Sequence, residues 1–215
     1  MSAMAGQMVA GRRLRLKRVI DISVSSLLLI LVSPLMLAVA IGVRLDSSGP
    51  ALFRQTRVGL DGREFTMLKF RSMCADAEQR LAGLAHLNSG GSRLIRIPSD
   101  PRVTRLGAFL RRTSLDELPQ LLNVLRGEMS LVGPRPQSPG EVALYTSLQR
   151  QRLSVLPGMT GLWQVTSRDD PSFAEWVRLD LDYIQRWSLG LDLKILLRTP
   201  LVVLGTANRR TGVMP

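Results

Sequence analysis

The sequence predicts an α+β fold, mainly helical, with an N-terminal membrane segment, a small β-hairpin and a cytoplasmic core that carries interfacial amphipathic helices. Three observations predict it: an uncharged run at residues 22–43, two strand-like runs around Asp61-Gly62, and leucines at helical spacing after residue 115. The chain divides into a basic N-terminal segment (1–18), a membrane segment (19–46), a core with interfacial helices (47–204) and a tail (205–215). Its 215 residues suffice for one domain with a hydrophobic core.

The composition favours anionic partners. Lys and Arg number 29 against 17 Asp and Glu, which gives a net charge of +12. Such an excess favours binding to nucleic acid, to phosphorylated substrates or to an anionic membrane surface. Cys74 is the only cysteine, so a disulfide within the chain is excluded, and a single histidine, His86, argues against a zinc site.

Residues 22–43 form the predicted membrane segment. The run ISVSSLLLILVSPLMLAVAIGV carries no charge, and a straight helix of that length would reach roughly 33 Å, the thickness of the hydrocarbon layer. No small-residue cleavage motif follows it, which argues against a removed signal peptide. Residues 1–18 carry five basic residues and no acid, which predicts a cytoplasmic N-terminus.

Ser33-Pro34 lies in the middle of this run. Proline removes a helical hydrogen bond and kinks or breaks a helix, although spanning helices often tolerate one. Two interpretations therefore stay open from the residues alone. One is a kinked span, and the other is a re-entrant hairpin whose limbs, each roughly 16 Å long, enter and leave the same leaflet.

Residues 51–73 predict a β-hairpin that turns at Asp61-Gly62. A hairpin alone does not require the five basic residues in this stretch: Arg54, Arg57, Arg63, Lys69 and Arg71. Residues 75–99 predict a helix and then a loop at about 88–99, which is either a linker or a mobile cover.

The segment RRTSLDELPQLLNVLRG predicts a helix that starts at about residue 115, after a shorter helix that ends near Arg112. Ser114 is the expected N-cap, with Glu117 three residues later to complete a capping box, and Gly127 ends the helix. Asp116 and Glu117 then have two interpretations. They are either a polar helix start favoured by the helix dipole or a reactive pair.

Two segments rich in glycine and proline follow, at residues 129–141 and 156–170. They carry Arg135 and Arg168, and each is either plain turn structure or a substrate loop. Near the C-terminus, LDLKILLRTPLVVL is too short and too charged to span a membrane. It predicts either an amphipathic interfacial helix or a buried core helix, before a frayed tail.

Taken together, these segments resemble the bacterial sugar transferases, the monotopic phosphoglycosyl transferases, from about residue 17 to 198. The resemblance rests on five motifs in the family order: KRVIDISVSSLLLILVSPLML, FRQTRVGLDGREFTMLKFRSM, DPRVTRLGAFLRRTSLDELPQLLNVLRGEMSLVGPRP, LPGMTGLWQVTSR and DYIQRWSLGLDLKILLRT. It implies the small, catalytic-core form of the family. Small departures are Ser72, where threonine is common, and Gly190, where a bulky residue is common.

The resemblance also implies roles for individual residues. Asp116 and Glu117 match the catalytic pair, with Asp116 as nucleophile and Mg²⁺ ligand, and Ser33-Pro34 matches the re-entrant break, which favours the hairpin at residues 19–46. Arg135 matches the substrate-loop arginine. Basic positions around the substrate phosphates match Lys69, Arg71, Arg111 and Arg168, and Asp180 is expected to support one of the arginines.

The implied reaction transfers a sugar phosphate from a UDP-sugar to undecaprenyl phosphate with release of UMP, at the cytoplasmic face of the bacterial inner membrane. Inner-membrane lipids and downstream glycosyltransferases are the other expected partners, in exopolysaccharide, lipopolysaccharide or glycoprotein glycan assembly. The sequence does not indicate which sugar is transferred. Two alternatives are a membrane-tethered phosphoesterase or pyrophosphatase and a basic membrane-anchored nucleic-acid-binding protein, and the motifs argue against nucleic acid as a partner.

Overall fold

The computed structural model describes residues 2–81, 83–84, 97, 100–167 and 172–211, without the side chains of 2–10, 81 and 206–211. The α-helices are α1 (Ser2–Asp46), α2 (Ala77–Leu81), α3 (Arg105–Thr113), α4 (Gln120–Arg126), α5 (Pro139–Ala143), α6 (Ser147–Arg150), α7 (Leu162–Thr166), α8 (Phe173–Arg186) and α9 (Leu189–Thr211). The strands are β1 (Leu52–Val58), β2 (Glu64–Phe70), β3 (Ser130–Val132) and β4 (Gly158–Thr160). The 3₁₀ turns include η1 (Leu60–Gly62), η3 (Leu115–Glu117) and η4 (Gln151–Ser154). The predicted mainly helical α+β class is confirmed.

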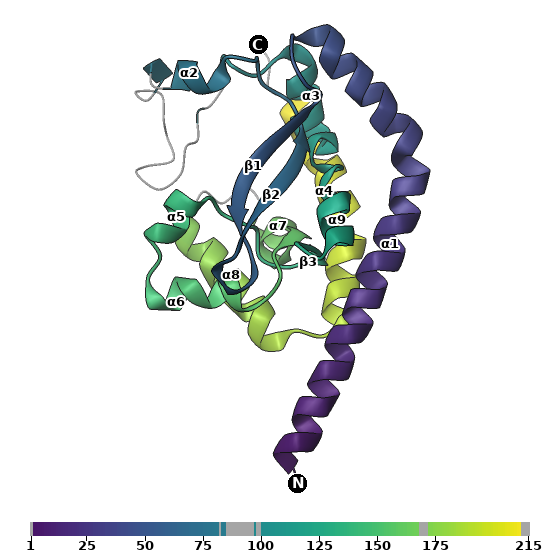
Figure 1. Cartoon of the computed structure of the whole chain (residues 1–215), viewed down its shortest axis with the longest axis vertical. Coiled ribbons are helices and arrows are strands. Elements are labelled where there is room, and N and C mark those ends of the chain that lie inside the picture. Colours follow the sequence, from purple (N-terminus) through teal and green to yellow (C-terminus); the bar gives the residue numbers. More distant parts are fainter. Residues whose placement is uncertain (1, 82, 85–96, 98–99, 168–171, 212–215) are drawn as a thin grey trace.

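The long helix α1 runs along one side of the molecule (Figure 1). It packs mainly on α4, which in turn packs on β2. The β1–β2 hairpin lies in the middle, and α5, α6 and α8 lie on the side away from α1. The hairpin and α4 therefore lie between α1 on one side and α5, α6 and α8 on the other.

Each of the two small sheets has two strands. β1 and β2 pair antiparallel, with Leu52 opposite Phe70, and the chain turns through Asp61 and Gly62 at positive φ angles of 54° and 78°. This confirms the predicted hairpin. β3 and β4 pair parallel, with Ser130 opposite Gly158. The parallel pair was not predicted from the sequence.

Helix α4 is fixed to β2 by a buried side chain. Asn123 accepts from the backbone N–H of Leu68 at 3.0 Å and donates to the carbonyl of Thr66 at 2.7 Å. Around it, one apolar cluster joins the hairpin, α4, β3, α8 and α9 through Met67, Leu121, Val124, Met129, Leu131, Val132, Tyr183 and Ile195. Because a buried amide without partners would cost about 1–3 kcal/mol, this contact fixes the register of α4 against the hairpin.

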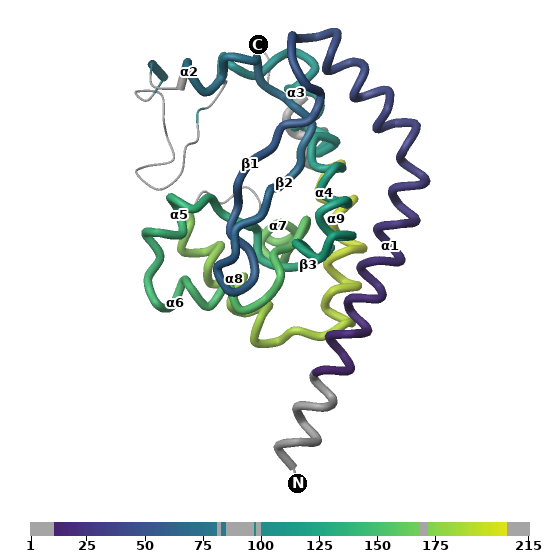
Figure 2. Tube along the Cα trace, in the orientation of Figure 1, coloured from purple at the N-terminus to yellow at the C-terminus, as the bar shows by residue number. Residues whose placement is uncertain are grey.

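The predicted break at Ser33-Pro34 is not found, because α1 is one continuous helix with Pro34 inside it. Proline has no N–H for the carbonyl of Ile30, but the Ser33 hydroxyl donates to that carbonyl at 2.9 Å. The helix therefore continues through the proline, and it curves around the core instead of breaking (Figure 2). The helix–break–helix of the prediction is corrected to a curved helix.

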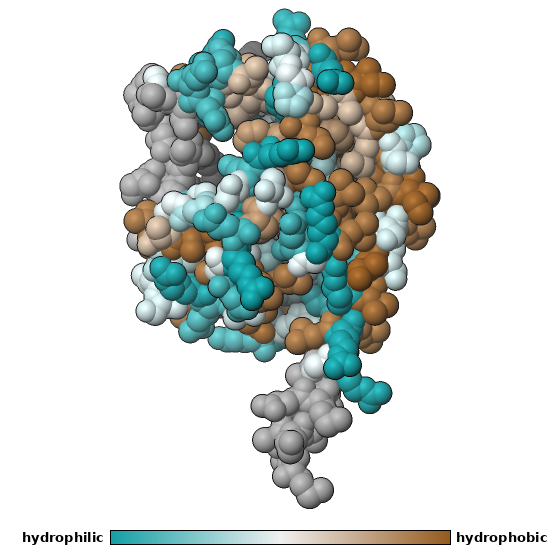
Figure 3. Space-filling view, viewed as in Figure 1, coloured by the Kyte–Doolittle hydropathy of each residue, from teal (hydrophilic) through white to brown (hydrophobic). Residues whose placement is uncertain are grey.

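The outer side of α1 is apolar and exposed. Within the described residues, α1 alone is long and apolar enough to cross a membrane, judged by length and composition. Its apolar residues cover the side of the molecule along α1 (Figure 3). The large exposed ones are Leu14, Leu16, Val19, Ile22, Leu27, Leu28, Ile30, Leu31, Leu35, Leu37, Ile41 and Leu45. Helix α9 adds a second exposed stripe of Leu193, Leu197, Leu201 and Leu204.

Candidate active site

Asp116 and Glu117 lie on the 3₁₀ turn η3, between α3 and α4. Ser114 ends α3 in the left-handed conformation, with φ 56°, and its N–H donates to carbonyls of the last turn of α3. It makes no side-chain cap for η3, and α4 begins only at Gln120. The predicted capping box is therefore wrong. Helical structure does start at Leu115, but as a 3₁₀ turn that is followed by α4. The seven-residue α4 begins after both acids, so they lie on a separate 3₁₀ turn and outside its first turn.

Glu117 is held by two cations from different parts of the chain. Its Oε1 accepts from Lys69 Nζ of β2 at 3.0 Å and from Arg135 Nη2, after β3, at 2.9 Å. Burial alone would raise the pKa of this carboxyl, but Arg135 and Lys69 outweigh it and hold the pKa below its usual range. These charged partners explain why Glu117 does not turn back to cap Ser114.

Asp116 is also buried, with 8% of its surface exposed. No hydrogen bond or ion pair of its carboxylate is found within the described ranges. Burial raises its pKa to about 6, and the neighbouring charge of Glu117 adds to the rise, while Lys69, Arg111 and Arg135 oppose it. A buried carboxylate among cations, with no hydrogen bond from the described residues, is suited to act on a ligand.

Arg111 approaches the same carboxylate from the last turn of α3. Its Nε donates to the Ser72 hydroxyl at 2.8 Å, and its charge acts to lower the pKa of Asp116. Ser72 thus supplies the hydroxyl that threonine would supply at this position. The structure brings four other predicted site residues close enough to Asp116 to act on its charge: Lys69, Arg111, Glu117 and Arg135.

Arg71 makes structural contacts that the sequence did not predict. Its guanidinium is buried at the C-terminal end of α1, where it donates to the carbonyls of Ser47 and Ser48, both at 2.6 Å, and of Val43 at 3.3 Å. The unpaired carbonyls of a helix end attract a cation. The guanidinium therefore stabilises the fold at the end of α1, and its assignment to the substrate phosphates stays a prediction. Arg168 and nearly all of the loop at 88–99 lie outside the described residues.

Asp180 supports an arginine, as predicted, but the arginine is Arg152. The Asp180 Oδ2 accepts from Arg152 Nε at 2.8 Å and lies 2.7 Å from Nη2, with both side chains almost fully buried. Arg152 also donates to the Tyr145 hydroxyl and to the Arg135 carbonyl, the latter at 3.2 Å. Asp180 thus supports the Arg135 loop, the segment 133–138 between β3 and α5, through Arg152. No sequence pattern had indicated a role for Arg152.

A bacterial sugar transferase family model matches residues 12–206, nearly the whole chain. The chain belongs to the bacterial sugar transferase family. This confirms the resemblance drawn from the five motifs.

Individual family members are 43–45% identical to it. The galactosyl transferase CpsE of Streptococcus agalactiae is 45% identical over 90% of this chain, which spans only 43% of CpsE. The exopolysaccharide production protein ExoY of Rhizobium meliloti is 43% identical over 85% of the chain and 83% of ExoY. The UDP-glucose:undecaprenyl-phosphate glucose-1-phosphate transferase of Caulobacter vibrioides is 45% identical over 89% of the chain and 71% of that protein.

The donor groups at this site suit Mg²⁺ that is held partly by substrate. They do not provide the several protein ligands that a metal ion held by protein alone would need. No cluster of three or more candidate metal ligands occurs in the part of the chain that the structure describes. Asp116 offers one carboxylate without a partner among the described residues, and Mg²⁺ is commonly held by one or two carboxylates together with substrate phosphates and water. We therefore expect Mg²⁺ to bind through Asp116 when a phosphorylated substrate is present.

We expect Asp180→Ala to lower the free energy of unfolding by about 3–5 kcal/mol, because Arg152 would keep a buried charge without its partner. The matched control is Glu175→Ala, which breaks the exposed pair with Arg178 and should cost at most about 1 kcal/mol. Urea unfolding of both variants in detergent measures the difference. Equal costs would mean that the buried pair does not stabilise this fold.

Proposed function

We propose that the protein transfers a sugar-1-phosphate from a UDP-sugar to undecaprenyl phosphate, with release of UMP, at the cytoplasmic face of the bacterial inner membrane. The observation that carries this proposal is that two adjacent carboxylates lie in different surroundings. Glu117 is ionised and bound by Lys69 and Arg135, whereas Asp116 is buried and has no described partner. The names of relatives that act on undecaprenyl phosphate support the substrate classes.

In the first step, an Asp116 carboxylate oxygen attacks the phosphorus that carries the sugar. A bond forms between this oxygen and phosphorus, and the bond from phosphorus to the bridging oxygen breaks. That oxygen leaves with its electron pair on UMP. A carboxylate is a competent nucleophile toward phosphorus, as aspartyl-phosphate enzymes illustrate.

Charge repulsion is the main obstacle to this step, because an anionic carboxylate must approach an anionic diphosphate. Arg111, Lys69 and Arg135 supply positive charge around the attacking group. Mg²⁺ held by Asp116 would neutralise further phosphate charge when it is bound. Glu117 holds Lys69 and Arg135 in place, which is a positioning role.

In the second step, a phosphate oxygen of undecaprenyl phosphate attacks the same phosphorus. The bond to Asp116 breaks, the carboxylate is restored, and the lipid carries a diphosphate-linked sugar. The acceptor oxygen is already an anion, so no strong base is required. This product would be the substrate of downstream glycosyltransferases.

A re-entrant arrangement of α1 would place this chemistry at the headgroup level. Both ends of the apolar run contact the same core: Arg18 donates to the carbonyls of Val124 and Leu125, and Arg71 binds carbonyls at the other end. A straight span would place those ends roughly 33 Å apart, on opposite membrane surfaces. The exposed stripe of α9 would lie in the interface beside α1.

We expect cysteines at positions 12 and 48 to be labelled from the same side of sealed vesicles. Both positions are exposed, and the variants Arg12→Cys and Ser48→Cys are made in a Cys74→Ser background. A membrane-impermeant maleimide applied to inside-out and right-side-out vesicles measures the labelling. Opposite-side labelling would establish a span.

The same assay tests Pro34. Pro34→Ala supplies the N–H that the Ile30 carbonyl lacks, so α1 should straighten and a larger fraction should label from opposite sides. Ser33→Ala, which keeps the proline, serves as the comparison.

Release of UMP from a panel of UDP-sugars, with and without undecaprenyl phosphate, tests the proposed function. We expect release to require the lipid for more than one turnover, and the panel identifies the sugar. Continuous release without lipid would instead identify a phosphoesterase or pyrophosphatase. No release with any donor would refute the proposal.

A further inference from the structure

Strand β3 pairs with another strand, β4, along only one of its two edges. Toward β4, the N–H of Ser130 donates to the Pro157 carbonyl at 2.8 Å, and the N–H of Gly133 donates to the Thr160 carbonyl at 2.9 Å. The other edge presents the N–H of Leu131 and the carbonyl of Val132. Backbone groups at a buried strand edge need partners, and a third strand would usually supply them.

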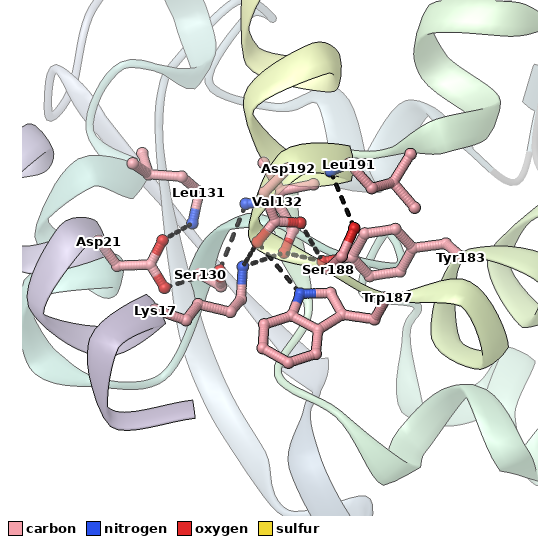
Figure 4. Close-up of polar contacts among 10 residues, drawn as sticks. All are labelled: Lys17, Asp21, Ser130, Leu131, Val132, Tyr183, Trp187, Ser188, Leu191 and Asp192. Atoms are coloured by element: carbon pink, nitrogen blue, oxygen red, sulfur yellow. Dashed lines mark hydrogen bonds and ion pairs between the residues drawn. The ribbon is translucent and has the colours of Figure 1, made fainter. Parts of the chain in front are cut away.

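Side chains of α1 replace that third strand (Figure 4). Asp21 Oδ1 accepts from the N–H of Leu131 at 3.2 Å, and Oδ2 accepts from the Ser130 hydroxyl at 2.8 Å. One helical turn earlier, Lys17 Nζ donates to the Val132 carbonyl at 3.2 Å. The donor Lys17 at position i and the acceptor Asp21 at position i+4 of the helix thus match the carbonyl and the N–H of the strand edge.

The cation of this pair is itself fixed. Asp192, at the start of α9, lies 2.6 Å from Lys17 Nζ, and it also accepts from the Tyr183 hydroxyl at 2.7 Å and the Trp187 indole at 3.1 Å. The pair is therefore attached to α8 and α9 as well as to β3. Such a network of buried partners has few alternative arrangements.

The position of β3 determines the position of Arg135. Only Gly133 and Pro134 separate the end of β3 from Arg135, whose guanidinium binds Glu117. The intervening Arg18 donates to the last carbonyls of α4, the helix that follows the two acids. One stretch of α1 therefore contacts both structures that meet at the Glu117–Arg135 pair.

We propose that Lys17 and Asp21 are positioning residues, which hold β3 so that Arg135 reaches Glu117 and the substrate phosphates. The base of the membrane helix is then part of the active-site framework in addition to being an anchor. The catalytic side of this inference rests on the proposed function, but the placement of the Arg135 loop can be measured without any substrate.

The test is a double-mutant cycle between Asp21→Ala and Arg135→Ala. We expect Asp21→Ala to lower kcat/KM about 10- to 100-fold in the native background, because small misplacements of a charge-stabilising group have effects of that size. In the Arg135→Ala background the same change should cost less than about twofold. Asp21→Asn, which keeps an acceptor for Leu131, should recover most of the activity.

A purely structural role would lower the active fraction equally in both backgrounds, and equal losses would overturn the inference. Arg13→Ala is the control for removing a charged side chain elsewhere on the same helix, since Arg13 is exposed, and membrane sedimentation monitors anchoring in every variant. Hydrogen exchange of peptides covering residues 130–137 gives a readout without activity. Exchange should rise in Asp21→Ala and stay unchanged in Arg13→Ala; unchanged exchange in both would refute the inference even if the proposed reaction is correct.

Discussion

Asp116→Asn will abolish sugar-phosphate transfer, with a loss of at least about 10⁴-fold in kcat, because an amide is a poor nucleophile toward phosphorus. The change is nearly isosteric, and the carboxylate makes no described hydrogen bond or ion pair that the fold would lose. The variant should therefore retain its unfolding transition and its membrane attachment. UMP release under saturating UDP-sugar and undecaprenyl phosphate measures the effect.

Glu117→Gln is the matched comparison one residue away. It removes the charge that holds Lys69 and Arg135 but leaves the nucleophile, so we expect a smaller loss of about 10²-fold. If Glu117→Gln were the more damaging change, the roles of the two acids would be reversed. Residual activity of Asp116→Asn above about 1% would exclude Asp116 as the covalent nucleophile.

Arg135→Lys should give the second-largest effect, a loss of about 10²-fold in kcat/KM. Lysine keeps the charge but loses the planar fork that can bind Glu117 and a phosphate oxygen together. The same UMP assay measures it, with the concentration of UDP-sugar varied to separate KM from kcat.

Arg112→Lys is the control, because no ion pair or hydrogen bond of the Arg112 side chain is found among the described residues. It should change kcat/KM less than about twofold. Arg111→Lys should fall between the two, since Arg111 is fixed by Ser72 and acts on Asp116 from one side. Equal and small effects at all three positions would mean that these arginines supply only general positive charge.

The sequence predicted the features that depend on local chemistry. Asp61-Gly62 specified the hairpin, because both residues tolerate positive φ, and the basic residues of β2 indicated a site that a plain hairpin does not need. Ser114 was misassigned because its spacing from Glu117 fits a capping box. The actual partners of Glu117, Lys69 and Arg135, come from 48 and 18 residues away. A local sequence pattern does not show which distant cations will contact Glu117 in the folded chain.

Other parts of the site depend on long-range packing and have no sequence signature. The parallel pairing of β3 with β4 joins the segments 129–141 and 156–170, whose glycines and prolines are typical of turns. Arg152 sits among polar residues, and only the fold shows that it is buried against Asp180 and the Arg135 loop. Arg71 resembled a phosphate ligand, and its burial against the end of α1 became visible only with α1 in place.

The most direct test of the covalent mechanism is mass spectrometry of the protein incubated with UDP-sugar and Mg²⁺ in the absence of lipid acceptor. The mechanism predicts about one equivalent of released UMP and a sugar-phosphate mass on a peptide that contains Asp116. Adding undecaprenyl phosphate should discharge this adduct. Steady-state transfer without any adduct, with both substrates required before UMP leaves, would contradict the mechanism and indicate direct transfer from donor to lipid.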